Sequence, residues 1–422
     1  MRFQTFLLIT AFFLSTQQAK AQSVAINTDG SAANASALLD VTSTQKGVLI
    51  PRMSRTERNA IAAPAAGLLV FQNAPDSLGF YYYTGTGWAW MHSNANADTL
   101  AWRTGGNTGT NANHFIGTAD NRDLIFKRNN VRSGYISTTN TAWGANALNP
   151  ASTGFNNTAL GLQALLSNTT SSRNTAIGVR ALTFNTTGAD NTAIGMETLR
   201  WNEGNSNVAV GFRSLDSNTT GYSNAAMGTK SLISNTIGFQ NSAVGMNALF
   251  SNTSGNNNVA SGFQSLYFNT SGYNNTANGM EALKANTSGY NNTATGTQAL
   301  FANTTGVFNT ATGVAALSSN TTGYNNTAMG MQALNSNING IFNTATGMAS
   351  LFFNTSGSAN TATGMDALKF NTIGYNNTAT GVSAMSANTE GIFNTATGVL
   401  ALSTNTTGSN NTAIGQQALN SN

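Results

Sequence analysis

Few side chains in this chain could carry out acid–base or metal chemistry. The sequence has no cysteine and two histidines, His92 and His114, neither of which lies near a serine or carboxylate pattern typical of a catalytic triad. The acids beyond residue 134 are Asp190, Glu197, Glu203, Asp216, Glu281, Asp366 and Glu390. This part of the sequence is a repeat, and the acids do not recur at one position in successive copies. The sequence therefore shows no carboxylate pair for general acid–base catalysis.

Signatures for bound phosphates and metals are missing as well. The sequence contains neither of the glycine-rich phosphate-binding loops, GxGxxG and GxxxxGK(S/T), and it lacks the Gly-and-Asp nonapeptide that binds calcium in other solenoids. We therefore expect no cofactor, no metal site and no enzymatic activity.

Charge argues against nucleic acid as a partner. Only 8% of the residues are charged, and the net charge of +4 arises within residues 1–134, which hold eleven Lys or Arg against seven Asp or Glu. The rest of the chain holds seven of each sign. A neutral region has no basic stripe to neutralise phosphates, so we expect no nucleic-acid binding.

The N-terminus predicts export. Residues 1–21 contain Arg2, an apolar run from Phe3 to Leu14 and a final Ala-Lys-Ala, the pattern of a secretory signal peptide. No later stretch is apolar for long enough to span a bilayer. The mature chain would begin at Gln22 and be secreted or held at the cell surface of a Gram-negative type of cell.

Small β segments are predicted ahead of the long C-terminal region. Residues 22–95 form an N-terminal β module, with strand-length apolar runs at 47–51 and 67–73 and a short helix between them. Residues 80–90 read aromatic strand, glycine turn, aromatic strand, which is typical of a hairpin. Its aromatic rings either pack the module or, alternatively, stack on sugars. Residues 96–138 are a second small β segment.

From residue 139 to 422 the sequence repeats itself. Aligned on one glycine, seventeen copies begin at Gly144, Gly161, Gly178, Gly195 and Gly211 and continue to Gly415. The glycine recurs at every seventeenth position, except that Gly211 comes one position early. A short fixed period predicts a solenoid in which each copy is one coil. Stacked at the strand spacing of about 4.8 Å, seventeen coils would make a rod of roughly 80 Å.

The repeat predicts a β-solenoid whose coil has one short parallel strand and one short helical turn. The stretch NTAxG is typical of a strand, whereas MEALKAN and MQALNSN place apolar residues three apart among good helix formers. We expect one or two helical turns that end at the following glycine. An all-β roll is the alternative.

Several positions are expected to form ladders of identical residues along the rod. Small Ala suits a crowded interior, Leu fills it, Asn can form amide ladders, and Gly permits positive φ or close backbone approach. In two adjacent copies these residues are Ala277, Gly279, Leu283, Asn286, Asn292, Ala294, Gly296, Leu300 and Asn303. A charged residue repeated at one position would lie beside the same charge in the next coil. The two charges would repel each other, which explains why charged residues are rare in the repeat.

The quoted segments resemble known families of fibres. The stretch SVAINTDGSAANASALLDV and its continuation to Trp88 resemble exported surface proteins of the Bacteroidetes group, and HFIGTADNRDLIFKRNNVRSGYIS is similar to the segment before the shaft in tail-fibre-like proteins. NTAxGxxAL is similar to head repeats of trimeric autotransporter adhesins. The resemblance implies a homotrimer and a role in adhesion.

Two non-enzymatic functions are consistent with this pattern. The first is an exported structural or adhesive fibre, whose recurring tyrosines Tyr273, Tyr290, Tyr324 and Tyr375 form a candidate surface for a glycan or protein ligand. The second is an ice-binding solenoid that orders water on stacked Thr-Ala-Thr strands. Against the second, Leu160, Ile194 and Val244 replace the second Thr, which would suit an interior position. The chain stops in mid-coil at Asn422, so we expect its natural C-terminal end to be missing.

Overall fold

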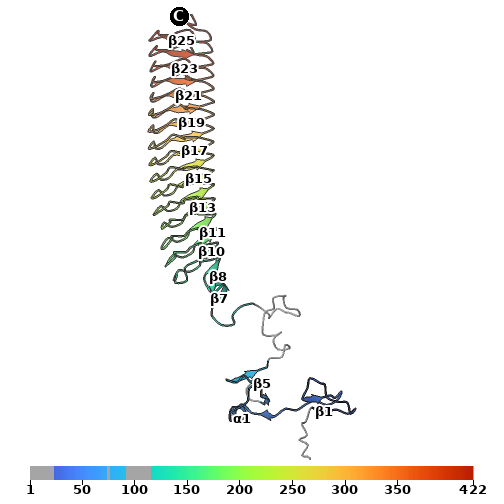
Figure 1. Ribbon diagram of the computed structural model, residues 1–422. Coiled ribbons are helices and arrows are strands. Elements are labelled where there is room, and N and C mark those ends of the chain that lie inside the picture. Colours follow the sequence, from blue (N-terminus) through green and yellow to red (C-terminus); the bar gives the residue numbers. More distant parts are fainter. Residues whose placement is uncertain (1–22, 74–76, 92–115, 422) are drawn as a thin grey trace, which may run out of the picture. The chain divides into compact units, whose positions relative to one another are not determined.

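A computed structural model describes residues 23–73, 77–91 and 116–421 (Figure 1). The chain divides into two compact units on either side of residues 116 and 117. The predicted signal peptide and both histidines, His92 and His114, lie outside the described residues.

The first unit contains two small sheets. β1 (Val24–Ile26) and β2 (Leu39–Val41) form a parallel pair. A four-stranded sheet has the order β3 (Arg52–Met53), β4 (Leu69–Gln72), β5 (Gly79–Tyr83) and β6 (Trp88–Trp90), with β3 parallel to β4 and the other pairs antiparallel. The predicted aromatic hairpin is therefore confirmed as β5 and β6.

A short helix joins β3 to β4, as the sequence predicts. α1 (Arg55–Asn59) begins with a capping box, in which the Ser54 hydroxyl accepts from the Glu57 N–H and the Glu57 carboxylate accepts from the Ser54 N–H. Of the two apolar runs, 67–73 contains β4, but 47–51 is not a strand. The structure begins pairing only at the end of that run, where the Phe71 N–H donates to the Pro51 carbonyl at 2.9 Å.

This first unit buries little of its own apolar surface. Among its described hydrophobic residues only Val70 and Tyr81 are buried, and Arg58 lies over the Tyr81 ring at 4.0 Å. By contrast, Leu49 is 77% exposed and Phe80 is 45% exposed. The described part of the module therefore leaves an apolar surface open to solvent.

The second unit is a solenoid with a hairpin at its N-terminal end. β7 (Leu124–Arg128) and β8 (Val131–Ile136) are antiparallel, and β8 pairs with β9 (Thr141–Trp143), the strand of the first coil. The later strands have three residues each: β10 (Thr158–Leu160), β11 (Thr175–Ile177), β12 (Thr192–Ile194), β13 (Val208–Val210), β14 (Ala225–Met227), β15 (Ser242–Val244), β16 (Val259–Ser261), β17 (Thr276–Asn278), β18 (Thr293–Thr295), β19 (Thr310–Thr312), β20 (Thr327–Met329), β21 (Thr344–Thr346), β22 (Thr361–Thr363), β23 (Thr378–Thr380), β24 (Thr395–Thr397) and β25 (Thr412–Ile414).

Each of these strands pairs in parallel with the next copy of itself. Ala277 of β17 faces Ala294 of β18, and Ala294 faces Ala311 of β19, so equivalent residues are always neighbours. Figure 1 shows the result as a stack of coils with one arrow per coil. The predicted solenoid and its repeat period are confirmed, including the single shortened coil between β12 and β13.

The predicted helical turn is wrong. After Gly279, the residues Glu281 and Leu283 have φ values of 57° and 51°, which an α-helix excludes. The Leu283 N–H donates to the Ala299 carbonyl of the following coil at 3.0 Å, and the Glu281 N–H donates to the Phe263 carbonyl of the preceding coil at 2.9 Å. Backbone groups are satisfied between coils rather than within a helix, because stacking places a partner beside every second residue.

The apolar spacing that predicted a helix has another cause. Met280 is 47% exposed, whereas Leu283 is fully buried. The two residues therefore lie on opposite sides of the chain, one outside the coil and one inside, instead of sharing one helical face. Nor does a helix end at the glycine of the Asn-Thr-Ser-Gly turn, since Gly289 has no positive φ.

The strands also correct the expectation about interior Thr and Val. In each solenoid strand the central Ala is buried and its two neighbours face outward, since successive side chains of a strand alternate. Leu160 is 45% exposed and Val244 is 39% exposed, so these residues replace Thr on the outer face and not in the interior.

Candidate functional surfaces of the solenoid

The interior of the coil is made of the predicted ladder residues. The fully buried members of the predicted set are Ala277, Leu283, Asn286, Asn292, Ala294, Leu300 and Asn303. The same rows continue as one core cluster from Ala142 to Ala413. The interior is thus filled by one chain alone, without side chains from a second chain.

Two asparagine rows bond each coil to the next. In the row before the strand, the Asn292 amide donates to Asn275 Oδ1 at 3.1 Å and to the Gly306 carbonyl at 2.8 Å. In the row after the buried leucine, the Asn303 amide donates to Asn286 Oδ1 at 2.8 Å and to the Gly306 carbonyl at 3.0 Å. These buried amides therefore stabilise the stack by continuous ladders of hydrogen bonds.

The two glycine rows are required by close contact between coils. Gly279 has a φ of 139°, and a Cβ placed there would stand 2.6 Å from the carbonyl oxygen of Gly296. At Gly289 the backbone φ is ordinary, but a Cβ would lie 2.4 Å from Asn286 Oδ1 and 2.5 Å from the Gly306 oxygen. The first row therefore consists of glycine throughout. The second row has one exception, Ser171, whose buried hydroxyl accepts hydrogen bonds from the Asn174 and Asn185 amides.

The four candidate ligand tyrosines do not form one continuous surface. Tyr273 and Tyr290 stack with centroids 4.7 Å apart and planes at 4°, and Tyr290 then meets Phe308 edge to face. Tyr324 and Tyr375 form two further, separate edge-to-face pairs, with Phe342 and Phe393 respectively. These ring contacts join neighbouring coils, while Tyr273, Tyr324 and Tyr375 keep 37%, 37% and 41% of their surface exposed, so a ligand surface at these tyrosines stays a prediction.

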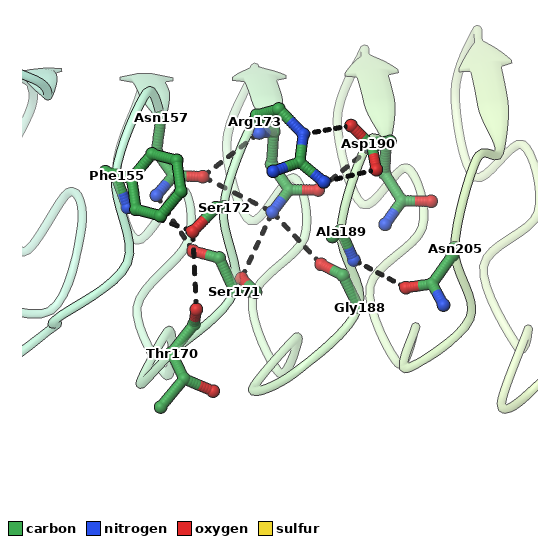
Figure 2. A network of polar contacts seen from close by, with 12 residues as sticks. Phe155, Asn157, Thr170, Ser171, Ser172, Arg173, Gly188, Ala189, Asp190 and Asn205 are labelled. Atoms are coloured by element: carbon green, nitrogen blue, oxygen red, sulfur yellow. Dashed lines mark hydrogen bonds and ion pairs between the residues drawn. The ribbon is translucent and has the colours of Figure 1, made fainter.

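Several charged side chains of the solenoid pair with opposite charges, either in a neighbouring coil or within one coil. Arg173 donates two hydrogen bonds to Asp190, at 2.5 and 2.8 Å, as Figure 2 shows. These bonds hold the pKa of the Asp190 carboxyl below its ordinary value. The described residues contain no group of three His, Asp or Glu side chains that could hold a metal ion.

Sequence reasoning missed a local concentration of charge. Nine of the fourteen charged residues beyond residue 134 lie between Arg173 and Lys230. Arg200 and Arg213 both contact Asp216, at 2.9 and 2.7 Å, and the Asp216 side chain is only 1% exposed. The sequence alone could have indicated this charge cluster, because the charged residues gather around the one coil that is shorter than the others.

Glu203 replaces backbone groups that the shortened coil lacks. In a full coil the N–H groups of Thr219, Thr220 and Gly221 converge on the Thr236 carbonyl, at 2.9, 3.1 and 3.2 Å. In the short coil, carboxylate oxygens of Glu203 instead accept from N–H and hydroxyl groups of the preceding coil, at 2.8 to 3.2 Å. Burial raises the pKa of Glu203, but these hydrogen bonds outweigh burial and leave the pKa below its ordinary value.

Comparison with known proteins gives one match. A family model described as a phage tail-like trimerisation region matches residues 25–111. No curated protein and no solved structure matches the chain. Among the described residues, no helix has the length and apolar character needed to cross a membrane. The trimerisation region and the solenoid together indicate a fibre-like structural protein and suggest a homotrimer.

Proposed function

We propose that the protein is an exported, non-enzymatic fibre of the cell surface, trimeric through its N-terminal module, with the solenoid as a shaft that carries recognition on its sides. The observation that carries the proposal is the uncovered apolar surface of the first unit, which coincides with the matched trimerisation region. A signal peptide at residues 1–21 supports export.

The first unit has the surface expected of a module that is completed by other copies. Val48, Leu49 and Ile50 line a cavity of about 200 Å³ together with Phe71 and Phe80, on a sheet that buries almost nothing by itself. Exposed apolar patches of this kind mark contacts between proteins. Two further copies would cover this surface and supply the missing core.

The shaft has a different relation to its partners. Its interior is closed within one chain, so the coils hold their shape without a neighbouring chain. On the outside, the position after the repeat glycine carries a stripe of half-exposed apolar residues, which includes Met246, Met280, Met331 and Met365. We propose that this stripe provides the side-by-side contact between shafts once the N-terminal modules have joined three chains.

Mass measurement on residues 22–422 by multi-angle light scattering tests the proposal, and we expect three times the mass of the chain. Leu49→Glu should lower the mass to that of one chain, because it places a carboxylate on the apolar surface. Gln45→Glu, which adds the same charge at an exposed position nearby, is the control and should remain trimeric. A monomeric parent protein at micromolar concentration contradicts the trimer.

Ice binding is a second candidate, favoured by the outward-facing threonines. Thr293 and Thr295 flank the buried Ala294, and the same arrangement stacks in register on Thr310 and Thr312 of the next coil. The two spacings of such an array are about 4.8 Å between coils and about 6.7 Å along a strand. Met329 interrupts the array in β20.

Ice recrystallisation in the presence of the full chain tests this second candidate. If the threonine array binds ice, Thr312→Lys should weaken the inhibition of crystal growth, because it puts a long charged side chain into the array. Thr305→Lys lies on an exposed turn outside the strands and should have no effect. Crystal growth at the rate seen in buffer alone excludes ice binding.

A further inference from the structure

One side of the solenoid carries a cavity at the charged, shortened part of the repeat. Its volume is about 360 Å³, and Gln163, Arg180, Thr183, Phe184, Arg200 and Trp201 line it. These residues come from three consecutive coils, from positions two, five and six after the repeat glycine. The size falls within the range of about 300 to 1,000 Å³ that small-molecule sites have.

Stacked aromatic rings form one wall of this cavity. Phe184 and Trp201 lie 4.0 Å apart with their planes at 18°. The coils on either side carry Ser167 and Ser217 at the equivalent position, and a serine cannot cover the outer face of a ring. Phe184 is therefore 38% exposed and Trp201 is 48% exposed.

The two arginines of the cavity, Arg180 and Arg200, belong to a charge cluster in which arginines outnumber carboxylates. Arg180, Arg200 and Arg213 share two acids, Glu197 and Asp216. Asp216 is taken by Arg200 and Arg213, at 2.9 and 2.7 Å. Glu197 lies at 3.4 to 3.6 Å from all three arginines, so none of them holds it closely. The cluster has one positive charge in excess.

Arg180 is the arginine best placed to bind a ligand. Its side chain is 52% exposed, and the only ion pair it makes with a described residue is the 3.5 Å contact with Glu197. Its Nε donates to the side chain of Gln163 at 3.2 Å, which orients the guanidinium. Thr183 donates its hydroxyl proton to the Arg180 carbonyl at 2.8 Å, so the Thr183 oxygen remains able to accept a bond from a ligand.

We propose that this cavity binds an acidic sugar, whose carboxylate pairs with Arg180 and whose ring packs on Phe184 and Trp201. A guanidinium binds a carboxylate through two parallel hydrogen bonds, and the flat apolar face of a pyranose matches an aromatic face. Thr183 and Gln163 are within the same cavity to bond sugar hydroxyls. The inference deepens the proposed recognition role and rests on it, but the site itself lies within one chain.

Saturation-transfer NMR and titration calorimetry on residues 22–422 test the site with four probes. D-glucuronate and N-acetylneuraminate are the acidic sugars, D-glucose tests the ring without charge, and acetate tests the charge without a ring. We expect binding of the acidic sugars only, weakening as salt is added. Equal binding of acetate and glucuronate, or binding of none of the four at ten millimolar, overturns the proposal.

The repeat itself supplies variants that keep the fold. Arg180→Gln installs the residue that Gln163 and Gln298 show at the same position, and Phe184→Ser installs that of Ser217. Arg180→Gln should weaken glucuronate binding at least about tenfold, the effect of losing a hydrogen bond to a charged group. Phe184→Ser should also weaken glucuronate binding, because it removes one of the two rings on which the sugar packs.

Arg173→Gln is the control and should leave sugar affinity unchanged, because it removes an arginine that pairs with Asp190 away from the cavity. Unchanged affinity in Arg180→Gln overturns the proposal. A monomeric protein that binds glucuronate would refute the trimeric fibre and keep the site, whereas a trimer that binds no sugar would do the reverse.

Discussion

The buried asparagine ladder can be tested at Asn303. Its amide nitrogen donates to Asn286 Oδ1 and to the Gly306 carbonyl, and its own Oδ1 accepts from the Asn320 amide at 2.8 Å. In Asn303→Ala, Asn286 Oδ1 loses its donor and one N–H of Asn320 loses its acceptor, while Gly306 keeps its bond from Asn292. Two unsatisfied buried groups at about 1–3 kcal/mol each predict a loss of about 2–6 kcal/mol.

Hydrogen exchange measured by mass spectrometry is the suitable assay, because a solenoid is stabilised by contacts between neighbouring coils. Protection should fall in the altered coil and in the coils on either side, over residues 286–320, and persist in distant coils. Thr305→Ala changes an exposed residue of the same coil and should leave exchange unaltered.

An isosteric variant separates the missing hydrogen bonds from the missing volume. Asn303→Asp keeps the size and the acceptor oxygen but aims a carboxylate oxygen at Asn286 Oδ1. Burial and the facing oxygen raise the pKa of this carboxyl. The variant should be destabilised at pH 7 and recover part of its protection as the pH falls towards about 4, because the protonated carboxyl donates again. Equal protection in Asn303→Ala and Thr305→Ala would refute the role assigned to the ladder.

Three further changes probe other rows of the coil. Leu334→Asp puts a charge into a fully buried position, and limited proteolysis should cut within residues 313–364; unchanged resistance would contradict the interior placement. Gly279→Ala places a Cβ 2.6 Å from the carbonyl oxygen of Gly296 and should lower the thermal midpoint more than Ala315→Gly, measured by circular dichroism. The lowered pKa of Glu203 means that its stabilising effect is present above its unfolded pKa and is lost as the pH falls through the folded value. Protection of the Thr186 and Thr187 amides, taken relative to their intrinsic exchange rates, should therefore fall below about pH 4 in the parent and depend less on pH in Glu203→Gln, whereas identical pH profiles would show that Glu203 plays no such role.

The stacking of the repeat could be predicted because the residues that determine it recur in every copy. Every copy has Ala at the position of Ala294 and Asn at the position of Asn292. Such strict identity is expected where these side chains stack in an interior that all coils share. The turn after the glycine could not be predicted, because residues such as Glu281 and Leu283 favour a helix in isolation. Their left-handed φ is stabilised by carbonyls of adjacent coils, which local sequence does not reveal.

The outer surface was harder still to infer. Alternation along a strand allows either the Ala or its flanking residues to face inward, and the choice of Ala follows from how little space the coil encloses. The ion pairs of Glu197 with Arg180 and with Arg213 join three consecutive coils, and they become visible only after the copies are placed in register. A survey of single positions therefore missed them.

Equivalence of neighbouring coils also has a genetic consequence. A copy gained or lost by recombination between similar gene segments lengthens or shortens the rod by about 4.8 Å and leaves the same residues in contact at the new junction. Selection can thus adjust the reach of the fibre in small steps without altering its cross-section. The short coil is the exception, because Glu203 serves the N–H groups of Thr186 and Thr187 in the copy before it. These two copies must therefore be kept or lost as a pair. Single copies can be gained or lost freely in the part of the gene that follows them.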